Sequence, residues 1–259
     1  MYYSPSRKFL FLHARKVAGS SVKVQLARQH ADDDVMIGGW PDAISQGADY
    51  NKRALRAAKS QKMAYTKASI RNFLLGKGFR PTPKEMNRLI KHHYQSQFGL
   101  EGAAHANAAS LKQGLGEGWD SAFKFAFVRN PWDHAVSDYY WRNGQKKGVS
   151  FKEFLHLLHD PATPDPNEVR PPIITNWSVY TIDGQIVADF IGRFEKLDSD
   201  LADVSKQIGI DLVARLPHSK SRSNTKSKSV ADHYDDQSIA LVHDIYRNEI
   251  EAFGYQVPF

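Results

Sequence analysis

A lysine and three small residues follow an apolar run near the start of the sequence. The segment KVAGSSV, residues 16–22, is separated from the apolar run FLFLH by two residues. Backbone N–H groups at the first turn of a helix carry partial positive charge, so a helix starting here would direct Gly19, Ser20 and Ser21 at an anion. The Lys16 ammonium would add a full charge. The segment predicts a phosphate cradle, with an ordinary helix cap as the alternative.

An arginine and a serine follow a second apolar pattern, FKFAFVRNPWDHAVSDYY, residues 123–140. The alternating phenylalanines predict a buried strand, which Asn-Pro ends before a helical pattern begins. Ligands of open α/β sheets bind at the carboxyl ends of parallel strands. Arg129 and Ser137 could therefore bind one phosphate, the arginine by bidentate bonds and the serine by its hydroxyl. Alternatively, Arg129 pairs with Asp133 or Asp138, and Ser137 bonds to its own helix.

The elements that would position these residues follow from the patterns around them. Two strand–loop–helix patterns far apart in the sequence predict an α/β fold with a parallel sheet flanked by helices. Between them, residues 82–85 (TPKE) form a capping-box pattern that opens a predicted helix of about four turns. Later, residues 186–191 predict a strand after a turn at residues 183–184, and residues 201–208 and 239–253 predict helices.

Length and composition limit the class of protein. The chain has 259 residues, no cysteine and a formal net charge of +7. We expect a single domain, residues 1–259, with a basic helical insertion at about residues 41–100. The absence of cysteine excludes disulfides and thiolate metal sites and favours a cytoplasmic setting. No signal-peptide pattern and no run of about 20 apolar residues is present, so we expect no membrane span.

The positive charge indicates an anionic ligand or partner, and it is concentrated in one stretch. Between Asp49 and His93 the sequence has twelve Lys or Arg residues and, besides Asp49 itself, one acidic residue, Glu85. The stretch predicts either a solvated helix surface or a platform for an anionic acceptor. A Ser- and Lys-rich segment, residues 218–229, could close over a bound ligand, with disorder as the alternative.

Four blocks of the sequence resemble, in order and spacing, those of sulfotransferases that use 3′-phosphoadenosine 5′-phosphosulfate (PAPS). Residues 16–22 resemble the loop that binds the 5′-phosphosulfate, and residues 125–140 resemble the 3′-phosphate motif. FIGRFEKL, residues 190–197, and YRNEIEAFGY, residues 246–255, resemble two further blocks. The resemblance covers most of the chain except roughly residues 31–100, and it points to the carbohydrate-type branch in its soluble bacterial form.

The resemblance implies a P-loop-like fold that transfers the sulfuryl group of PAPS to a hydroxyl or amine, releases adenosine 3′,5′-bisphosphate (PAP) and needs no metal. The acceptor is expected to be a hydroxyl-bearing glycan, an anionic one if the basic stretch is a platform. By this resemblance, the residues expected to bind the 5′-phosphosulfate are Lys16, Ala18, Gly19, Ser20 and Ser21. Those expected to bind the 3′-phosphate are Arg129 and Ser137.

Three positions depart from the family pattern. Arg15 stands in place of the usual Pro, Val17 in place of Thr or Ser, and His134 in place of Arg. Val17 removes one hydroxyl that could bind the donor. None of the three is a residue carried over to the site.

Sulfuryl transfer also requires stabilisation of the leaving oxygen and a base for the acceptor. Lys16 suits the first role and a histidine suits the second. His105 is the first candidate, because related sequences often carry a histidine before a similar Ala-rich helix; a capping or core histidine is the alternative. His92 or His93 is the next candidate for the base, and Glu195 is expected to be structural.

Two other function classes remain open. A nucleotide kinase would share the fold, but the lysine here precedes the glycine, and no Mg²⁺-binding carboxylate follows a strand. A nucleic-acid-binding protein would explain the charge but not the two phosphate loops, and no reader motif is present. No set of His, Asp and Glu residues shows the spacing of metal ligands, so no metal site is predicted.

Overall fold

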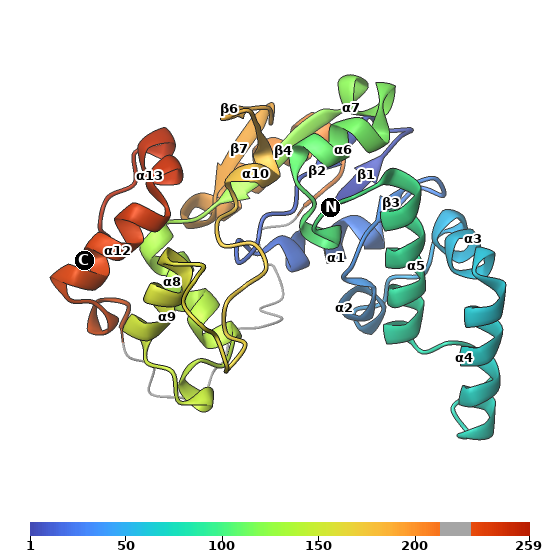
Figure 1. The fold of residues 1–259 in the computed structure, drawn as a ribbon. Coiled ribbons are helices and arrows are strands. Elements are labelled where there is room, and N and C mark those ends of the chain that lie inside the picture. Colours follow the sequence, from blue (N-terminus) through green and yellow to red (C-terminus); the bar gives the residue numbers. More distant parts are fainter. Residues whose placement is uncertain (213–228) are drawn as a thin grey trace. The chain divides into compact units, whose positions relative to one another are not determined.

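The computed structural model describes residues 1–212 and 229–259. The chain divides into two compact units, which are described separately (Figure 1). Unit 1 contains Met1–Phe127 and Ser178–Ser219, and unit 2 contains Val128–Trp177 and Lys220–Phe259. Of the predicted closing segment, residues 218–229, all but Ser229 lie outside the described residues.

A five-stranded sheet forms the centre of unit 1. Its order is β3-β1-β2-β4-β7. The strands are β1 (Tyr2–Ser4), β2 (Phe9–Phe11), β3 (Val35–Met36), β4 (Phe123–Val128) and β7 (Phe190–Arg193). β2 pairs parallel with β4, with Phe11 opposite Phe125, and these two rings stack with centroids 5.0 Å apart. The phenylalanines of both strands therefore build the buried core that the alternating pattern predicted.

The sheet is mixed, because β1 pairs antiparallel with both β2 and β3. The prediction of a parallel sheet is right for the β2–β4 pair and wrong for β1. A tight turn, in which Lys8 N–H bonds to the Pro5 carbonyl at 3.3 Å, joins β1 to β2. So short a connection allows only antiparallel pairing.

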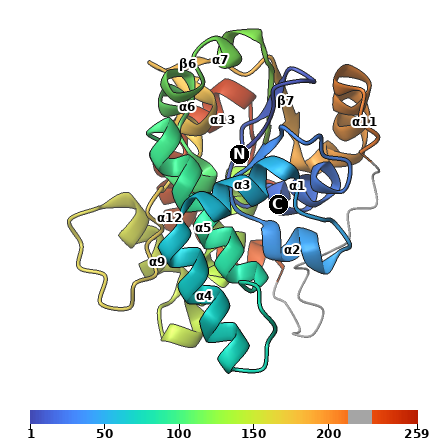
Figure 2. The ribbon, with the colours of Figure 1, turned by 90° about the vertical axis from the view of Figure 1, so that its right-hand side faces the viewer.

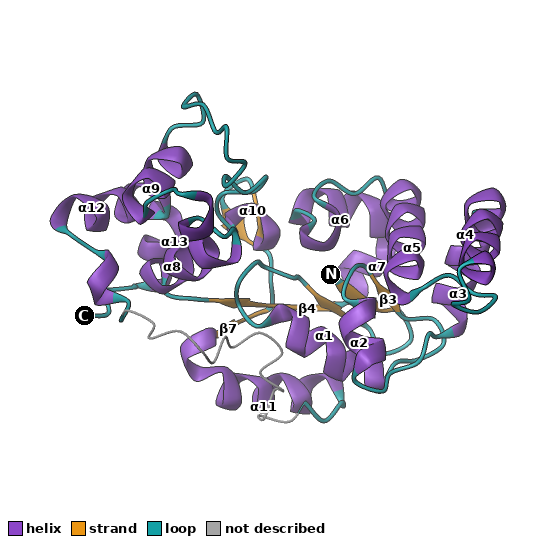
Figure 3. Ribbon diagram, turned by 90° about the horizontal axis from the view of Figure 1, so that it is seen from below, coloured by secondary structure: helices purple, strands orange, loops and turns teal. Residues whose placement is uncertain are grey.

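Helices lie on both sides of this sheet. Figure 3 shows α1 (Gly19–Arg28) and α11 (Leu197–Ile208) on one side, and α5 (Pro83–Phe98) and α6 (Ala108–Leu115) on the other. Further helices of unit 1 are α2 (Trp40–Ser45), α3 (Lys52–Ser60), α4 (Lys62–Leu74) and α7 (Glu117–Ser121). No helix among the described residues combines the length and the apolar character that crossing a bilayer requires.

Short sequence motifs predicted the start of α5 correctly but placed one strand wrongly. The predicted capping box opens α5: Thr82 Oγ1 accepts a bond from Glu85 N–H, and Glu85 Oε2 accepts one from Thr82 N–H. Asp183 and Gly184 both have positive φ and form the predicted turn, but the turn joins the hairpin strands β5 (Thr181–Ile182) and β6 (Gln185–Ile186). The strand that enters the main sheet is β7, so the prediction of one strand over residues 186–191 is wrong.

Unit 2 is helical, with α8 (Pro131–Trp141), α9 (Phe151–His159), α12 (Asp236–Ile245) and α13 (Arg247–Phe253). The short helix α10 (Trp177–Tyr180) spans the boundary between the units. The predicted helix over residues 239–253 is broken at Tyr246, whose φ of −110° and ψ of 25° leave the helical region. The buried Tyr246 ring packs instead on His134, with centroids 5.4 Å apart.

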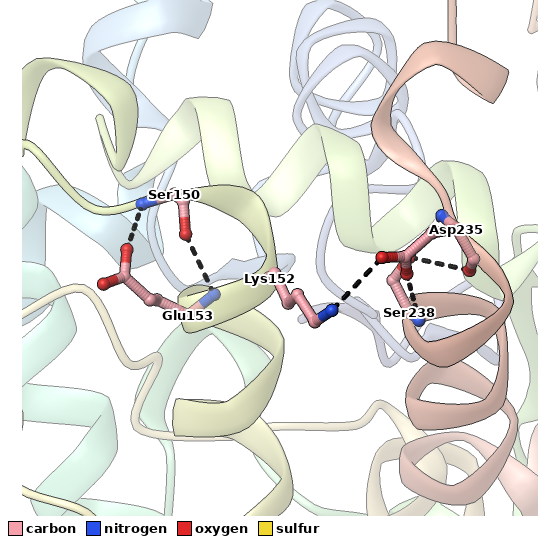
Figure 4. A network of polar contacts seen from close by, with 5 residues as sticks. All are labelled: Ser150, Lys152, Glu153, Asp235 and Ser238. Carbon is pink, nitrogen blue, oxygen red and sulfur yellow. Dashed lines mark hydrogen bonds and ion pairs between the residues drawn. The ribbon is translucent and has the colours of Figure 1, made fainter.

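Polar contacts join the starts of α9 and α12 (Figure 4). Ser150 and Glu153 form a capping box at α9, and Asp235 caps α12 by accepting a 2.7 Å bond from Ser238 N–H. Lys152 of α9 lies 3.2 Å from Asp235 Oδ2. One exposed ion pair thus connects the N-terminal ends of the two helices, next to the buried aromatic ring of Phe151.

Candidate functional site

The loop between β2 and α1 has an unusual backbone. Lys16 and Ala18 have φ values of 62° and 60°, in the left-handed region that residues other than glycine rarely adopt. Such a conformation is unfavourable by about 1–3 kcal/mol per residue and is concentrated at functional sites. Left-handed residues in a loop can also turn neighbouring N–H groups toward one concave space that binds anions. The backbone therefore supports the predicted cradle.

The start of α1 supports the same interpretation. Ala18 is the N-cap and makes no side-chain cap bond. Ser21 and Val22 donate their N–H groups to the Ala18 carbonyl at 2.9 and 3.2 Å. The N–H groups of the first turn point away from the helix, where an anion can accept from them. The half-buried Lys16 lies just before this turn, and Val17 is fully buried, so its methyl groups serve the core.

Gly19 is required by the close approach of a histidine ring. A Cβ at this position would lie 2.0 Å from His13 Cδ2 and 2.2 Å from His13 Nε2. His13 is buried and follows the carboxyl end of β2. The sequence motifs did not include His13; the signal that could have found it is its place after a parallel strand ends, next to the loop.

We expect Gly19→Ala to lower the melting temperature by roughly 2–10 °C, because overpacking at a rigid site costs about 1–3 kcal/mol. His13→Ala should remove the clash, so the double variant should lose less stability than the two single variants added together. Thermal unfolding of all four proteins measures this coupling. Strictly additive losses would mean that the ring of His13 is not what excludes a side chain at position 19.

His105 contacts the same histidine. It ends the short 3-10 helix η1 (Ala103–His105), and its ring lies 4.4 Å from that of His13, centroid to centroid. His105 Nδ1 is 2.8 Å from the His13 carbonyl oxygen. Because a carbonyl only accepts, Nδ1 carries the proton, and Nε2 is left with the lone pair. The structure thus brings the predicted base to the loop through His13.

Both rings are held neutral. Burial lowers the pKa of His105 to about 3, although the bond to the His13 carbonyl raises it, and the charge of Lys23 lowers it further. Burial and the charge of Lys23 also hold the pKa of His13 well below its usual value. Lys23 is itself buried and donates to the carbonyls of Ile37 and Gly38 at 3.0 and 2.9 Å. An anion bound at the loop would oppose these positive charges and raise the pKa of His105 toward the range useful for a base.

Arg129 and Ser137 lie in unit 2, on either side of the start of α8, and both are half-buried. Asn130 begins the helix: its Oδ1 accepts from Trp132 N–H at 3.1 Å, and its Nδ2 donates to the Gln256 carbonyl at 2.9 Å. The cap fixes where α8 starts and therefore fixes the position of Arg129, which lies between the end of β4 and the helix. Ser137 is in the second turn of α8, as the sequence predicted.

His134, which replaces the usual arginine of the resemblance, has a structural place. It is buried, and its Nδ1 lies 3.2 Å from the Tyr246 hydroxyl. Its Nε2 lies 3.5 Å from Asn176 Nδ2. The imidazole therefore joins α8 to the break between α12 and α13 inside unit 2.

The remaining candidates lie elsewhere. His93 packs against α3, with Nδ1 3.0 Å from Ser60 Oγ, while His92 is exposed. Glu195 lies in the 3-10 helix η3 (Phe194–Lys196). Among the described residues, no three His, Asp or Glu side chains are arranged to hold a metal ion. The structure groups Lys16, Ala18, Gly19, Ser20, Ser21 and His105 in unit 1, whereas Arg129 and Ser137 belong to unit 2.

Comparison with known proteins gives a consistent result. The model of a family described as "Sulfotransferase family" matches residues 1–256. Carbohydrate sulfotransferase 12 of Xenopus laevis is 32% identical over 115 residues, which cover 42% of this chain and 26% of that protein. Human carbohydrate sulfotransferase 10 is 26% identical over 155 residues, 53% of this chain and 44% of that protein. An uncharacterized protein of Archaeoglobus fulgidus is 35% identical over 96 residues, 36% of this chain and 72% of that protein.

The matches to the two carbohydrate sulfotransferases thus span less than half of their length. No solved structure matches the chain.

Proposed function

The chain belongs to the sulfotransferase family, and from this premise we propose that it transfers a sulfuryl group from PAPS to a hydroxyl group of a carbohydrate. The observation that carries the proposal is the loop before α1, where two left-handed residues lead into a helix start without a side-chain cap. The names of the relatives support a carbohydrate acceptor. An amine acceptor would use the same chemistry.

We propose that the loop binds the 5′-phosphosulfate of the donor in the manner of a P-loop. Ala18, Gly19 and Ser20 would supply backbone N–H groups, and Ser20 and Ser21 would supply hydroxyls, which fit a phosphate or sulfate oxygen. When bound, the donor supplies an activated sulfuryl group, and PAP is the product. Lys16 would stabilise the negative charge that grows on the bridging oxygen as the bond to sulfur breaks.

His105 would act as the base. Its Nε2 would take the proton of the acceptor hydroxyl while the acceptor oxygen forms its bond to sulfur. The bond from Nδ1 to the His13 carbonyl, 2.8 Å long, holds the ring and fixes the tautomer that this role needs. His13 is then a positioning residue.

Arg129 and Ser137 would bind the 3′-phosphate, the arginine by charge-assisted bonds and the serine by its hydroxyl. The family match includes residues of both units, so we propose that both units contribute to one activity. The region from α2 to α5, which carries the basic stretch, would be a helical insertion, and the acceptor is proposed to be a glycan.

The 3′-phosphate assignment gives a test that needs no acceptor. At a hundredfold excess over Kd, PAP should stabilise the protein by about 2.7 kcal/mol and raise the melting temperature by roughly 5–10 °C. AMP and ATP should do much less, because they lack the 3′-phosphate. Arg129→Ala should erase most of this preference, and Ser137→Ala should reduce it less, because only one hydrogen bond to the charged phosphate is lost.

Arg247→Ala is the matched control, because Arg247 is an exposed arginine of the same unit that pairs with Asp244 three residues away. It should leave the preference intact. Equal shifts with ATP and PAP would favour a kinase. No shift with any nucleotide, together with tight and salt-sensitive binding to DNA or RNA, would favour a nucleic-acid-binding protein.

A further inference from the structure

Helix α4 buries polar side chains and exposes large apolar ones, the reverse of an ordinary surface helix. Its buried residues are Ser69 and Asn72, while Met63, Phe73 and Leu74 are 89%, 59% and 76% exposed. Surface helices normally bury their large apolar side chains and expose their polar ones. An exposed apolar face of this kind marks an interaction site.

Polar contacts fix this orientation. Asn72 Nδ2 donates to Glu85 Oε2 at 2.7 Å and to the Arg80 carbonyl at 3.0 Å. Arg71 pairs with the same glutamate, which also belongs to the capping box of α5. Lys77 N–H bonds to the Asn72 carbonyl at 2.8 Å. Rotating α4 to bury its apolar side would break the contacts of Asn72 and Arg71 with Glu85 of α5, so the exposure is built into the fold.

The apolar face continues into the loop after the helix. Nine large hydrophobic side chains are exposed among the described residues, and six of them lie within residues 63–79: Met63, Ile70, Phe73, Leu74, Leu75 and Phe79. The rings of Phe73 and Phe79 contact each other edge to face, with centroids 5.4 Å apart. We call the exposed side chains of residues 62–80 the α4 surface.

The α4 surface is also strongly basic. Within residues 62–80 the sequence has five Lys or Arg residues and no Asp or Glu. Lys62, Lys67, Lys77 and Arg80 are exposed among the apolar side chains. Within unit 1, α4 packs on α3 and α5 and lies at the edge away from the sheet (Figures 1 and 2). The surface is therefore open along the outer side of the unit.

We propose that the α4 surface binds an anionic phospholipid bilayer. Lys and Arg side chains would meet the headgroup phosphates, while the Phe, Leu, Ile and Met side chains would enter the boundary between headgroups and acyl chains. With 13 residues α4 is too short to span a bilayer, so it would lie in the plane of the interface. A glycan or nucleic acid would satisfy the charges but not the six apolar side chains, and a second copy of the chain would bring like charges together.

The proposal does not depend on the sulfotransferase reaction and is tested with the full chain and vesicles. We expect the protein to sediment with phosphatidylcholine vesicles that contain about one-third phosphatidylglycerol, and to bind pure phosphatidylcholine vesicles at least roughly tenfold more weakly. Raising the salt concentration should weaken binding to the anionic vesicles, because it screens exposed charges.

Two pairs of substitutions separate the apolar and the electrostatic contributions. Phe73→Ser with Leu74→Ser should reduce vesicle binding at least about tenfold, because two large apolar side chains are lost from the interface. Ile186→Ser, at an exposed apolar position of β6, is the matched control and should change binding by less than about twofold. Lys67→Glu with Lys77→Glu should reduce binding by roughly 10²-fold.

Lys112→Glu with Lys146→Glu makes the same change in net charge at exposed positions outside the surface and should have much less effect. Thermal unfolding confirms that each variant is folded. The proposal is overturned by equal binding to neutral and anionic vesicles, or by variants of the α4 surface that bind like wild type. It is also overturned if the wild-type protein does not bind vesicles but self-associates or binds heparin, and Phe73→Ser with Leu74→Ser abolishes that self-association or heparin binding.

Discussion

Replacing His105 by alanine should lower kcat by roughly 10²–10⁴-fold, the usual contribution of a positioned base. The affinity for PAP should stay close to that of wild type, because the base acts on the acceptor. The rate of the wild-type protein should fall on the acid side as Nε2 becomes protonated, and this limb should be missing from the residual activity of the variant. Transfer of labelled sulfate from PAPS, with an acceptor first found in a panel of glycans, phenols, lipids and amines, measures both effects.

A structural role for His105 is distinguished by a second variant. Asparagine can place its amide N–H against the His13 carbonyl but cannot act as a base at neutral pH. His105→Asn should therefore keep more of the thermal stability than His105→Ala and lose as much activity. His92→Ala tests the next candidate, an exposed histidine of the same unit, and should leave kcat unchanged if His105 is the base. Normal activity in both His105 variants, with loss of activity in a variant of His92 or His93, would place the base on α5.

The features that could be predicted from the sequence are those fixed by neighbours along the chain. Thr82 and Glu85 are three residues apart, and each satisfies a backbone N–H of the other, so the start of α5 followed from residue types alone. The alternating phenylalanines likewise identified β4, and the loop before α1 followed from glycine and serine at a helix start. In these cases the interactions that decide the structure lie within a few positions.

The features that escaped prediction depend on contacts between distant segments. The role of His13 in the candidate site depends on its contact with Gly19 and on its contact with His105, which is ninety-two positions later in the chain. The break at Tyr246 depends on the packing of its ring on His134. The spacing of apolar residues did not predict that α4 exposes its apolar side, because the decisive contact is the hydrogen bond from Asn72 to Glu85. Patterns along a sequence report which residues could share a face, but not which face is buried.

Lys16→Ala should reduce kcat by roughly 10²–10³-fold at saturating donor, because the charge on the leaving oxygen then develops without its partner. That charge is absent from bound PAPS and grows as the bond to sulfur breaks, so binding of PAPS should weaken much less than catalysis. Lys112→Ala, at an exposed lysine of α6, is the matched control and should leave kcat unchanged. The left-handed backbone of Lys16 adds a further constraint, since the loop must hold this conformation with any residue at the position. Lys16→Gly, which adopts it without strain, should therefore be at least as stable as Lys16→Ala and equally inactive. Retention of kcat with a higher KM for PAPS would show that Lys16 only binds the donor, and the proposed role in leaving-group stabilisation would then be wrong.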